Sequence, residues 1–451
     1  MASIPFLRLR GVAAAALLAA GFGGAGSAGA ITIEQAYQAA LKNDPVFRMR
    51  SFERDSGREN AILGRSQLLP NVAASHSVSR NNADYLQPSI IPGVMQLTHP
   101  QYLSRSSVVQ LRQPLFNVDA IQRYRQGKVQ TAQAEQAYEA GVDEVSVRVI
   151  TAYLDTLFAE DQLALARVQR DMHLEQQKVN QRLFEKGEGT KTDTLETQAR
   201  LDLAEAQLIE SQNNVVAART TLSGVIGLDP GDLQQLGDNF RPVTLDVAGF
   251  EDWRRLALAN NNTLAALRLA VENSRLEVGR NKAAHLPRVD FVAAYSKNDS
   301  EQLNLRGTES TNRTLGIQIN LPIYSGGAIN AQTRQAAANY GRVQAELDAR
   351  TNEILVELRR AHDLVLNSGR KIDALVKAVD SGKLLMTATE QSIRGGVRIN
   401  LDLLNAQQQL FTSQRDLAQA RYAYLVGLMR LRAASGTLAP EAVREIAAFF
   451  R

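Results

Sequence analysis

Long windows without proline, each broken once by glycine, dominate the hydrophobic pattern of this chain. Residues 115–229 and 323–439 contain no proline, and windows of this length permit very long helices. Each window holds one glycine-containing break, at 186–189 and at 395–396. The pattern predicts two helical hairpins, each with a helix of about 68 residues, a tight turn and a return helix of about 37 residues.

Apolar residues recur every seven positions in both return helices. One row holds Leu201, Leu208, Val215 and Leu222, and the other holds Leu410, Leu417, Tyr424 and Leu431. A second row, three positions later, carries mostly small residues such as Ala204 and Gly427. This spacing is typical of knobs-into-holes packing, and small residues let helices approach closely. An ordinary two-helix hairpin would show the same local pattern.

A further helix is expected ahead of the strands in each half, over roughly 33–68 and 250–285. This helix has about 34 residues. Its length and that of the return helix together add up to about the length of the long helix. One long helix can therefore lie beside two shorter helices stacked end to end, in a column on the order of 100 Å long.

Between the prolines the hydrophobic period changes from 3.6 to 2. Apolar residues alternate with polar ones over Val289–Tyr295 and over Leu315–Leu321. Half-buried strands are predicted at about 70–80, 105–115, 287–296 and 313–323, joined in pairs by polar or proline-rich loops at 81–104 and 297–312. Strands of this length with one apolar face suit a transmembrane barrel. A small soluble sheet that covers a helical bundle is the alternative.

Identical residues recur in the same order in the two halves of the chain. Matched pairs include Leu41 and Leu258, Asn43 and Asn260, Asp193 and Asp402, and Gly227 and Gly436. Internal similarity of this kind predicts two repeat units. The predicted divisions are a first unit at 31–227 with its hairpin at 118–227, a linker at 228–249, a second unit at 250–436 with its hairpin at 326–436, and a terminal segment at 437–451.

Residues 1–30 are predicted to be a secretory signal peptide. They combine two arginines with an apolar Ala/Leu stretch and end in an A-x-A sequence at 28–30. The apolar run is short for a membrane span, which needs about 20 residues, and no later stretch is apolar enough for a membrane helix. The mature chain is therefore expected to be exported, and to be either soluble or a β-barrel.

Composition removes several classes of function. The 451 residues include no cysteine, which excludes disulfides, thiolate metal sites, cysteine nucleophiles and a lipidated N-terminal cysteine. The five histidines are far apart, with no HExxH pair to hold a metal ion. Because no nucleophile–base cluster or cofactor motif is present, we expect neither enzymatic activity nor a cofactor. The formal charge of +4, half of it from residues 1–30, gives little support for nucleic-acid binding.

Two strand pairs per chain cannot close a membrane barrel, since such barrels have at least about eight strands. Open strand edges cannot face lipid, because their N–H and C=O groups would have no hydrogen-bond partner. If the strands lie in a membrane, the chain must therefore associate with itself. Three copies would supply twelve strands and twelve helical columns, and cyclic symmetry would close their head-to-tail interfaces.

Several segments resemble the TolC family of outer-membrane channels. They are TIEQAYQAALKNDP at 32–45, QPLF at 113–116, LPIYSGG at 321–327, RGGVRINLDLLNAQQQL at 394–410 and RDLAQARYAYLVGLMRLRAASGTL at 415–438. The resemblance covers nearly all of 31–437. It implies an α+β membrane protein, a homotrimer whose twelve-stranded β-barrel lies in the lipid of a Gram-negative outer membrane and continues into the periplasm as a long coiled-coil α-barrel. It also implies an equatorial collar built from 228–249 and 437–451.

The amino-acid sequence of the second hairpin and the short C-terminal end most resemble the type I secretion branch of this family. That resemblance implies a passive conduit, opened by an inner-membrane ABC transporter and a periplasmic adaptor, for a secreted protein. The outer-membrane component of a drug or metal efflux pump is the alternative within the same fold. A soluble periplasmic coiled-coil adaptor is the alternative from another class.

The same resemblance implies a gate at the hairpin turns. Thr192, Asp193 and Arg398 match family positions that latch the closed entrance, and Asp402 matches an acidic ring at the lumen constriction. Asn405 stands where a second acid is often found, so three carboxylates are expected at the constriction of a trimer and cation preference should be mild.

Two observations compete with the latch. Ile393 stands where the family often has a link-forming tyrosine, so one latch bond is expected to be absent. The spacing of Asp193 and Glu196 also fits a helix cap, and Asp402 begins the equivalent helix. Capping and a place in the lumen can coexist, because a capping carboxylate can still face the pore.

Overall fold

The computed structural model describes most of the chain. The described residues are 30–88, 91–237, 240–242, 249–301, 307–395, 397–438 and 440–450. The predicted signal segment lies outside them except for Ala30, and so does part of the predicted linker.

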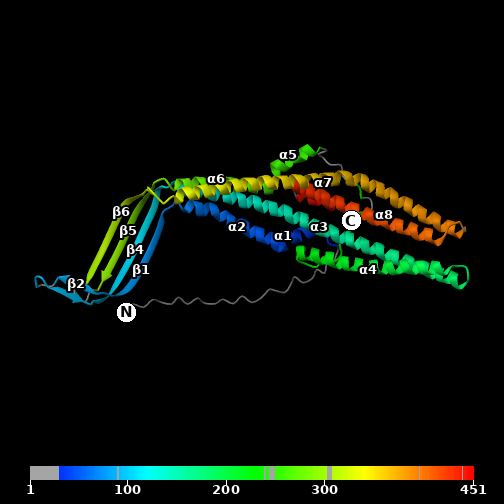
Figure 1. Cartoon of the computed structure of the whole chain (residues 1–451), viewed down its shortest axis with the longest axis horizontal. Helices are drawn as coiled ribbons and strands as arrows, with labels where there is room; N and C mark the ends of the chain where they lie inside the picture. The colour runs from blue at the N-terminus through cyan, green and yellow to red at the C-terminus, as the bar shows by residue number, and fades with distance from the viewer. Residues whose placement is uncertain are drawn as a thin grey trace, which may run out of the picture.

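Two long helical hairpins make up most of the molecule (Figure 1). The first consists of α3 (Val118–Glu185, 68 residues) and α4 (Lys191–Ile226, 36 residues). The second consists of α7 (Ala328–Arg394, 67 residues) and α8 (Asn400–Ser435, 36 residues). Both turns lie at the end of the molecule remote from the sheet (Figure 1).

Each helix expected ahead of the strands is divided in two, so the prediction of one unbroken helix is wrong in both halves. The first half has α1 (Ile33–Asn43) and α2 (Pro45–Ser66), and the second has α5 (Phe250–Asn260) and α6 (Asn262–Ala283). The residues at the breaks, Asp44 and Asn261, have ψ angles of 117° and 118° and cap the helix that follows. Pro45 disfavours helical backbone at Asp44, whereas at Asn261 the side-chain cap alone accompanies the break.

The helices form four columns. In the half nearer the sheet, α2 contacts α3, α3 contacts α6 and α6 contacts α7; in the other half, α3 lies between α4 and α8, and α8 contacts α7. The long helices α3 and α7 therefore run through both halves, while α2 and α4, like α6 and α8, share a column (Figure 1).

The core is densest around the middle of α3 and α8. There α1 packs against α3, α4 and α9 (Pro440–Ala447). The fully buried Tyr153 of α3 ties two distant segments to this core. Its hydroxyl donates to Ile31 O, just before α1, at 2.8 Å and accepts from Gln234 N, in the segment after α4, at 3.0 Å. Buried polar side chains of this kind are stable only when their hydrogen bonds are satisfied.

One four-stranded antiparallel sheet extends from the helices (Figure 1). It consists of β1 (Asn71–Asn82), β4 (Gln101–Phe116), β5 (Arg288–Ser300) and β6 (Thr308–Asn320), in the order β1-β4-β5-β6. The loop expected at 81–104 contains a small hairpin of its own, β2 (Tyr85–Pro88) and β3 (Met95–Thr98). Within the described residues, β1 and β6 each have one neighbouring strand.

The two faces of the sheet differ in chemistry. Since successive side chains point to opposite faces, the strand register places Arg112, Asp290 and Gln318 on one face. The other face carries Leu315 and Ile317, which are 77% and 66% exposed.

Among the helices that the structure describes, none combines the length and apolar composition of a membrane span.

The breaks between the stacked helices also cap the return helices. Asn43 Nδ2 donates to Ile226 O at 2.9 Å, and Asn261 Nδ2 donates to Ala434 O at 3.0 Å. At the end of α8, Gly436 adopts a φ of +68°, and a Cβ added there would overlap the backbone of Asn260. Contact between this turn and the α5–α6 break therefore requires glycine.

We expect Gly436→Ala to lower the free energy of unfolding by more than about 1 kcal/mol, because it adds left-handed strain and a backbone clash. Gly224→Ala is the matched control, since Gly224 lies within α4 and an added Cβ there would meet no atom within 4 Å. Thermal unfolding of the detergent-solubilised protein, followed by helical circular dichroism, compares the two. Equal stability of the two variants would contradict this account of the turn.

Candidate gate at the hairpin tips

Asp193 at the first tip is part of a helix cap. Thr190 is the N-cap of α4, and its hydroxyl accepts from Asp193 N at 3.1 Å. The Asp193 carboxylate accepts in return from the Thr190 hydroxyl at 2.6 Å and from Thr190 N at 3.3 Å. The cap thus begins three residues earlier than the predicted pairing of Asp193 with Glu196, because the threonine supplies the N-cap oxygen. The neighbouring Thr192 is exposed.

The second tip has no such cap. Ile399 occupies the N-cap position of α8 and has no side chain that could accept a hydrogen bond. Asp402 lies in the first turn of this helix, half-buried, where a carboxylate is favoured by the helix dipole. Arg398 and Asn405 are exposed. Within the described part of the chain, the side chains of Arg398, Asp402 and Asn405 form no hydrogen bond or ion pair.

The structure does not bring the predicted latch residues together within one chain. No hydrogen bond or ion pair among the described residues joins Thr192 or Asp193 to Arg398. The two hairpins meet instead through Gln176 of α3, whose Nε2 donates to Asn400 Oδ1 at 2.8 Å. Because Asn400 begins α8 while Gln176 lies nine residues before the end of α3, the second tip lies against the flank of the first hairpin.

We call Gln169, His173, Gln176 and Asn180 of α3 with Asn400, Gln407 and Gln408 of α8 the polar seam. Two hydrogen bonds cross it, from Gln169 to Gln408 and from Gln176 to Asn400, and the other members lie three, four or seven positions from these residues, on the same helix faces. His173 is 2% exposed and Gln407 is equally buried. Four buried atoms of the seam, His173 Nδ1, Asn180 Nδ2, Asn400 Nδ2 and Gln407 Oε1, have no hydrogen-bond partner among the described residues. Each buried polar group that stays unsatisfied costs about 1–3 kcal/mol.

Sequence reasoning did not single out this seam, although a signal was present. Ala166, His173 and Asn180 are buried at intervals of seven on α3, so two polar residues occupy a heptad row that normally holds apolar ones. A polar residue at such a position fixes the register of paired helices at a cost in stability.

Nearer the middle of the molecule, α3 is paired with both α4 and α8. Arg219 of α4 donates to Glu160 of α3 at 2.5 and 2.9 Å, and the Tyr422 hydroxyl of α8 donates to Asp161 at 2.7 Å. Burial raises the pKa of Asp161, and the bond from Tyr422 opposes that rise. Of these pairs, that of Tyr422 with Asp161 joins the two hairpins.

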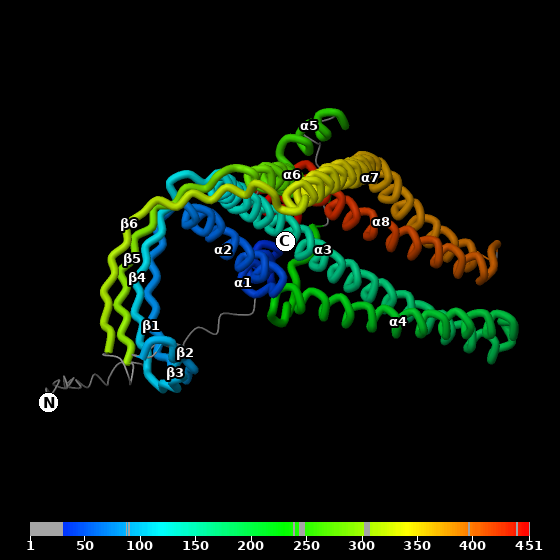
Figure 2. Tube along the Cα trace, turned by 60° about the vertical axis from the view of Figure 1, so that its left-hand side comes forward, coloured from blue at the N-terminus to red at the C-terminus, as the bar shows by residue number. Residues whose placement is uncertain are grey.

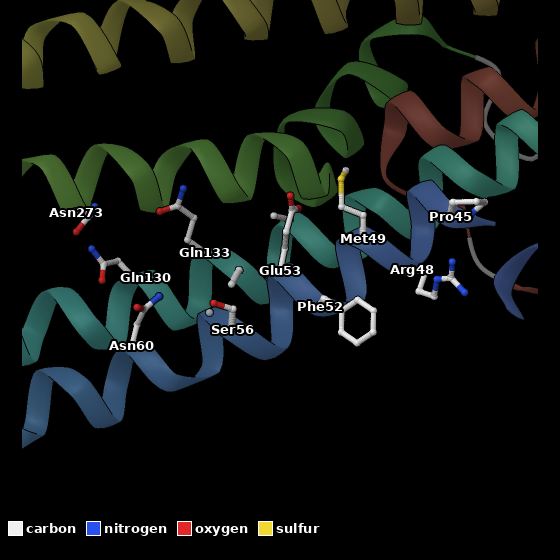
Figure 3. A pocket seen from close by; sticks show the side chains of 13 residues that line it. Pro45, Arg48, Met49, Phe52, Glu53, Ser56, Asn60, Gln130, Gln133 and Asn273 are labelled. Carbon is white, nitrogen blue, oxygen red and sulfur yellow. The ribbon is translucent and has the colours of Figure 1, made fainter. Parts of the chain in front are cut away.

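A groove of about 870 Å³ crosses α2, α3 and α6 on the half nearer the sheet (Figure 3). It is lined by amide side chains such as Gln130 and Asn273, while Phe52, 65% exposed, points from α2 away from α3. No cluster of three or more potential metal-ligating side chains occurs among the described residues. The groove therefore offers polar contacts and an open apolar rim, with no evident reactive centre.

Comparison with known proteins identifies the family. Residues 36–228 and 253–437 match the family model described as "Outer membrane efflux protein". The chain belongs to this family. It is thus an outer-membrane protein, and the TolC-family resemblance expected from its sequence is confirmed.

Two secretion proteins are among its relatives. The chain is 39% identical to alkaline protease secretion protein AprF of Pseudomonas aeruginosa, over 93% of this chain and 88% of the relative. It is 36% identical to proteases secretion protein PrtF of Dickeya chrysanthemi, over 94% and 92% of the two chains. The solved Campylobacter jejuni CmeC outer membrane channel has the same fold, with a TM-score of 0.78 at 17% identity over 93% of this chain and 90% of that one.

We expect the polar seam to make stability depend on pH through His173. Burial, and secondarily the charge of Arg200, lowers the pKa of His173 below its ordinary 6.5. The unfolded chain then binds this proton more readily, so stability should fall as the pH drops below about 6.5. His173→Leu should remove this loss and raise the unfolding temperature, because it also removes an unpaired buried nitrogen.

Thermal unfolding between about pH 5 and pH 7.5 measures this linkage. The exposed His285→Leu serves as the control for loss of a histidine as such. If His173→Leu and the wild-type protein lost stability equally on acidification, the assignment to His173 would be wrong.

Proposed function

We propose that the chain is the outer-membrane exit duct of a type I protein secretion system. The observation that carries this proposal is the 36–39% identity, over more than nine-tenths of the chain, to two proteins named for the secretion of proteases. A secreted protein is accordingly the proposed cargo. The chain would act as a passive conduit, with energy supplied by an inner-membrane ABC transporter through a periplasmic adaptor.

Closure of the sheet supports a homotrimer. β1 and β6 lie at the edges of the four-stranded sheet, and an edge in lipid would leave N–H and C=O groups without partners. Pairing of β6 with β1 of the next copy removes every edge, and three copies give a closed barrel of twelve strands. Head-to-tail contacts of this kind close under cyclic symmetry.

The outer helical columns support the same closure. Large apolar side chains are exposed on α2 and α4 at one side of the chain, and on α7 at the other. They are Met49, Phe52 and Ile62 of α2, Leu203, Ile209 and Val216 of α4, and Val356, Leu366 and Leu384 of α7. Burial of one set against the other in neighbouring copies would form a continuous α-barrel.

The faces of the sheet support its orientation in the membrane. In the proposed barrel the face with Leu315 and Ile317 contacts outer-membrane lipid, and the face with Asp290 lines a watery lumen. Towards the far end of the lipid-facing side, charged pairs replace apolar residues, as in Arg105 with Asp299 at 3.2 Å and Lys297 with Glu309 at 2.5 Å. This boundary is what an apolar band about 25 Å tall would produce. It also disfavours the soluble-adaptor alternative, which leaves the band unexplained.

We include in the proposal the division of the chain that was predicted from its sequence. Units 31–227 and 250–436 would each supply two strands and two columns, while 228–249 and 437–451 would form the collar. Contacts of Leu233 with Ile31 and of Leu236 with Phe450 support a collar at this level.

At the periplasmic end, Thr192, Asp193 and Arg398 would act as a latch between neighbouring copies, and Asp402 with Asn405 would line the constriction. Arg398 is exposed and unpaired within the described chain, so its guanidinium is available to a neighbour. Asp193 is already held by Thr190, which positions its carboxylate at the tip.

We expect Arg398→Ala and Asp193→Ala to raise the resting conductance of the trimer in planar bilayers, because each removes a bond that holds the entrance shut. Glu188→Ala is the matched control, since it removes an exposed acid of the same turn and leaves the Thr190–Asp193 cap in place. A double variant that conducts no more than the wild-type protein would remove the latch from the proposal.

We expect Asp402→Asn to weaken block by a multivalent cation such as hexaamminecobalt several-fold, and Asn405→Asp to strengthen it. The physical reason is the change of three carboxylates at one level of a narrow pore. Titration of single-channel current with the cation measures both. A block that neither substitution alters would mean that these residues do not face the lumen.

Secretion itself is tested by deleting the gene. Culture supernatant should lose one or a few proteins, and expression of the chain should restore them, while susceptibility to drugs and metal ions stays at the wild-type level. The efflux alternative, favoured by the name of the family model, predicts an unchanged set of secreted proteins and a several-fold rise in susceptibility.

A further inference from the structure

The β2–β3 hairpin is an amphipathic element at the free end of the sheet (Figure 2). Its register pairs Tyr85 with Thr98, Leu86 with Leu97, and Pro88 with Met95. Because side chains alternate along a strand, Leu86, Pro88, Met95 and Leu97 share one face, which we call the apolar hairpin face. Leu86 is 63% exposed, and Met95 and Leu97 are each 55% exposed.

The sequence of the hairpin is unusual for this chain. Residues 85–98 contain no Asp, Glu, Lys, Arg or His, although 22% of the whole chain is charged. A two-stranded hairpin is marginally stable in water by itself, and exposed apolar faces on surface hairpins invite association. Burial of the apolar hairpin face against another surface would therefore stabilise the hairpin.

The hairpin bends towards the polar face of the sheet. The Tyr85 and Tyr102 hydroxyls are 3.1 Å apart and hydrogen-bonded. Tyr102 shares its face of β4 with Ser104 and Ser106, which bond across the strands to Asn81 at 2.8 Å and Asn298 at 2.7 Å. Tyr85 lies on the polar side of the hairpin, so this side is turned to the sheet and the apolar hairpin face is turned away from it.

The bend has a local cause. The β1–β4 ladder continues past its ends through one bond, from Ala83 N to Pro100 O at 3.3 Å. Pro100 has no N–H to continue the ladder, and Figure 2 shows β2 and β3 leaving the line of β1 and β4 at this level. The hairpin is thereby placed beside the polar wall of the sheet and on the side opposite to Leu315 and Ile317.

We propose that the apolar hairpin faces of three copies pack against one another on the three-fold axis and close the outer mouth of the duct. This inference rests on the proposed trimer, in which the polar face of the sheet is the wall of the lumen. The hairpin lies beside the lumen wall, and its apolar face is turned away from that wall. This face is therefore directed to the three-fold axis, where the hairpins of the other two copies lie in the resting channel.

Two observations favour a second copy over the other occupants. The hairpin continues directly from β1, the edge strand that meets the neighbouring copy in the proposed barrel. Membrane lipid lies on the opposite face of the sheet in that barrel, so it cannot reach the apolar hairpin face without reversing the Tyr85–Tyr102 contact. A passing cargo would have to part the three hairpins, which gives the duct a second barrier in series with the periplasmic gate.

Cysteine cross-linking tests the proposal, since the natural chain has no cysteine. Met95→Cys and Leu97→Cys place a thiol on the apolar hairpin face. Gln96→Cys, between them on β3 and on the polar side, is the matched control. Each full-length protein is purified in detergent, shown to be trimeric by light scattering, and treated with a short bis-maleimide.

On a denaturing gel, both apolar-face variants should shift from the monomer position to cross-linked dimers, because one thiol per chain can join only two chains, while Gln96→Cys should stay monomeric. Equal cross-linking at all three positions, or none at Met95 and Leu97 in a protein that is trimeric, would overturn the plug and leave the proposed function intact. Protein that is monomeric by light scattering would refute the proposed trimer itself. In cells, cross-linking of Met95→Cys to a different protein in place of its own copies would also overturn the proposal.

Discussion

Backbone hydrogen bonding along two strand edges is the constraint on which the rest of this structure depends. β1 and β6 each have a neighbour on one side only among the described residues, and an unpaired amide in hydrocarbon costs on the order of several kcal/mol. In the proposed barrel of this outer-membrane protein both edges would lie in lipid, where that cost decides how the copies assemble. Each chain supplies four strands of the main sheet and four helical columns among its described residues, so the three copies proposed to close the sheet would also close the ring of helices.

Much of the helical body could be predicted because its signals are local. Prolines bound the hairpins and glycines mark their turns, and the observed hairpins at Val118–Ile226 and Ala328–Ser435 lie within two residues of the expected limits. The breaks at Asp44 and Asn261 were missed because a single capping residue is a weak signal within an otherwise continuous helical pattern. The Asp44-Pro45 pair was the sequence signal for the first of these breaks, because a residue before proline disfavours helical backbone.

The candidate site was harder to predict, since its properties come from contacts between distant segments. A cap at the first tip was expected, but its position depended on Thr190, a residue that the pairing of Asp193 with Glu196 left out. The polar seam joins residues more than 200 positions apart, as in Gln176 with Asn400. The β2–β3 hairpin was hidden in a proline-rich loop, because strands of four residues carry too little periodicity to detect.

The uninterrupted length of α3 has a mechanical consequence. From Tyr153, which is fixed in the core by Ile31 and Gln234, the helix continues for 32 residues to Glu185 without proline. This gives a rigid arm of about 48 Å, so a rotation of roughly 5° at its base would sweep the far end through about 4 Å. A small torque applied at the pivot is thereby converted into a displacement comparable to the width of a water molecule or more, with no flexible joint along the way.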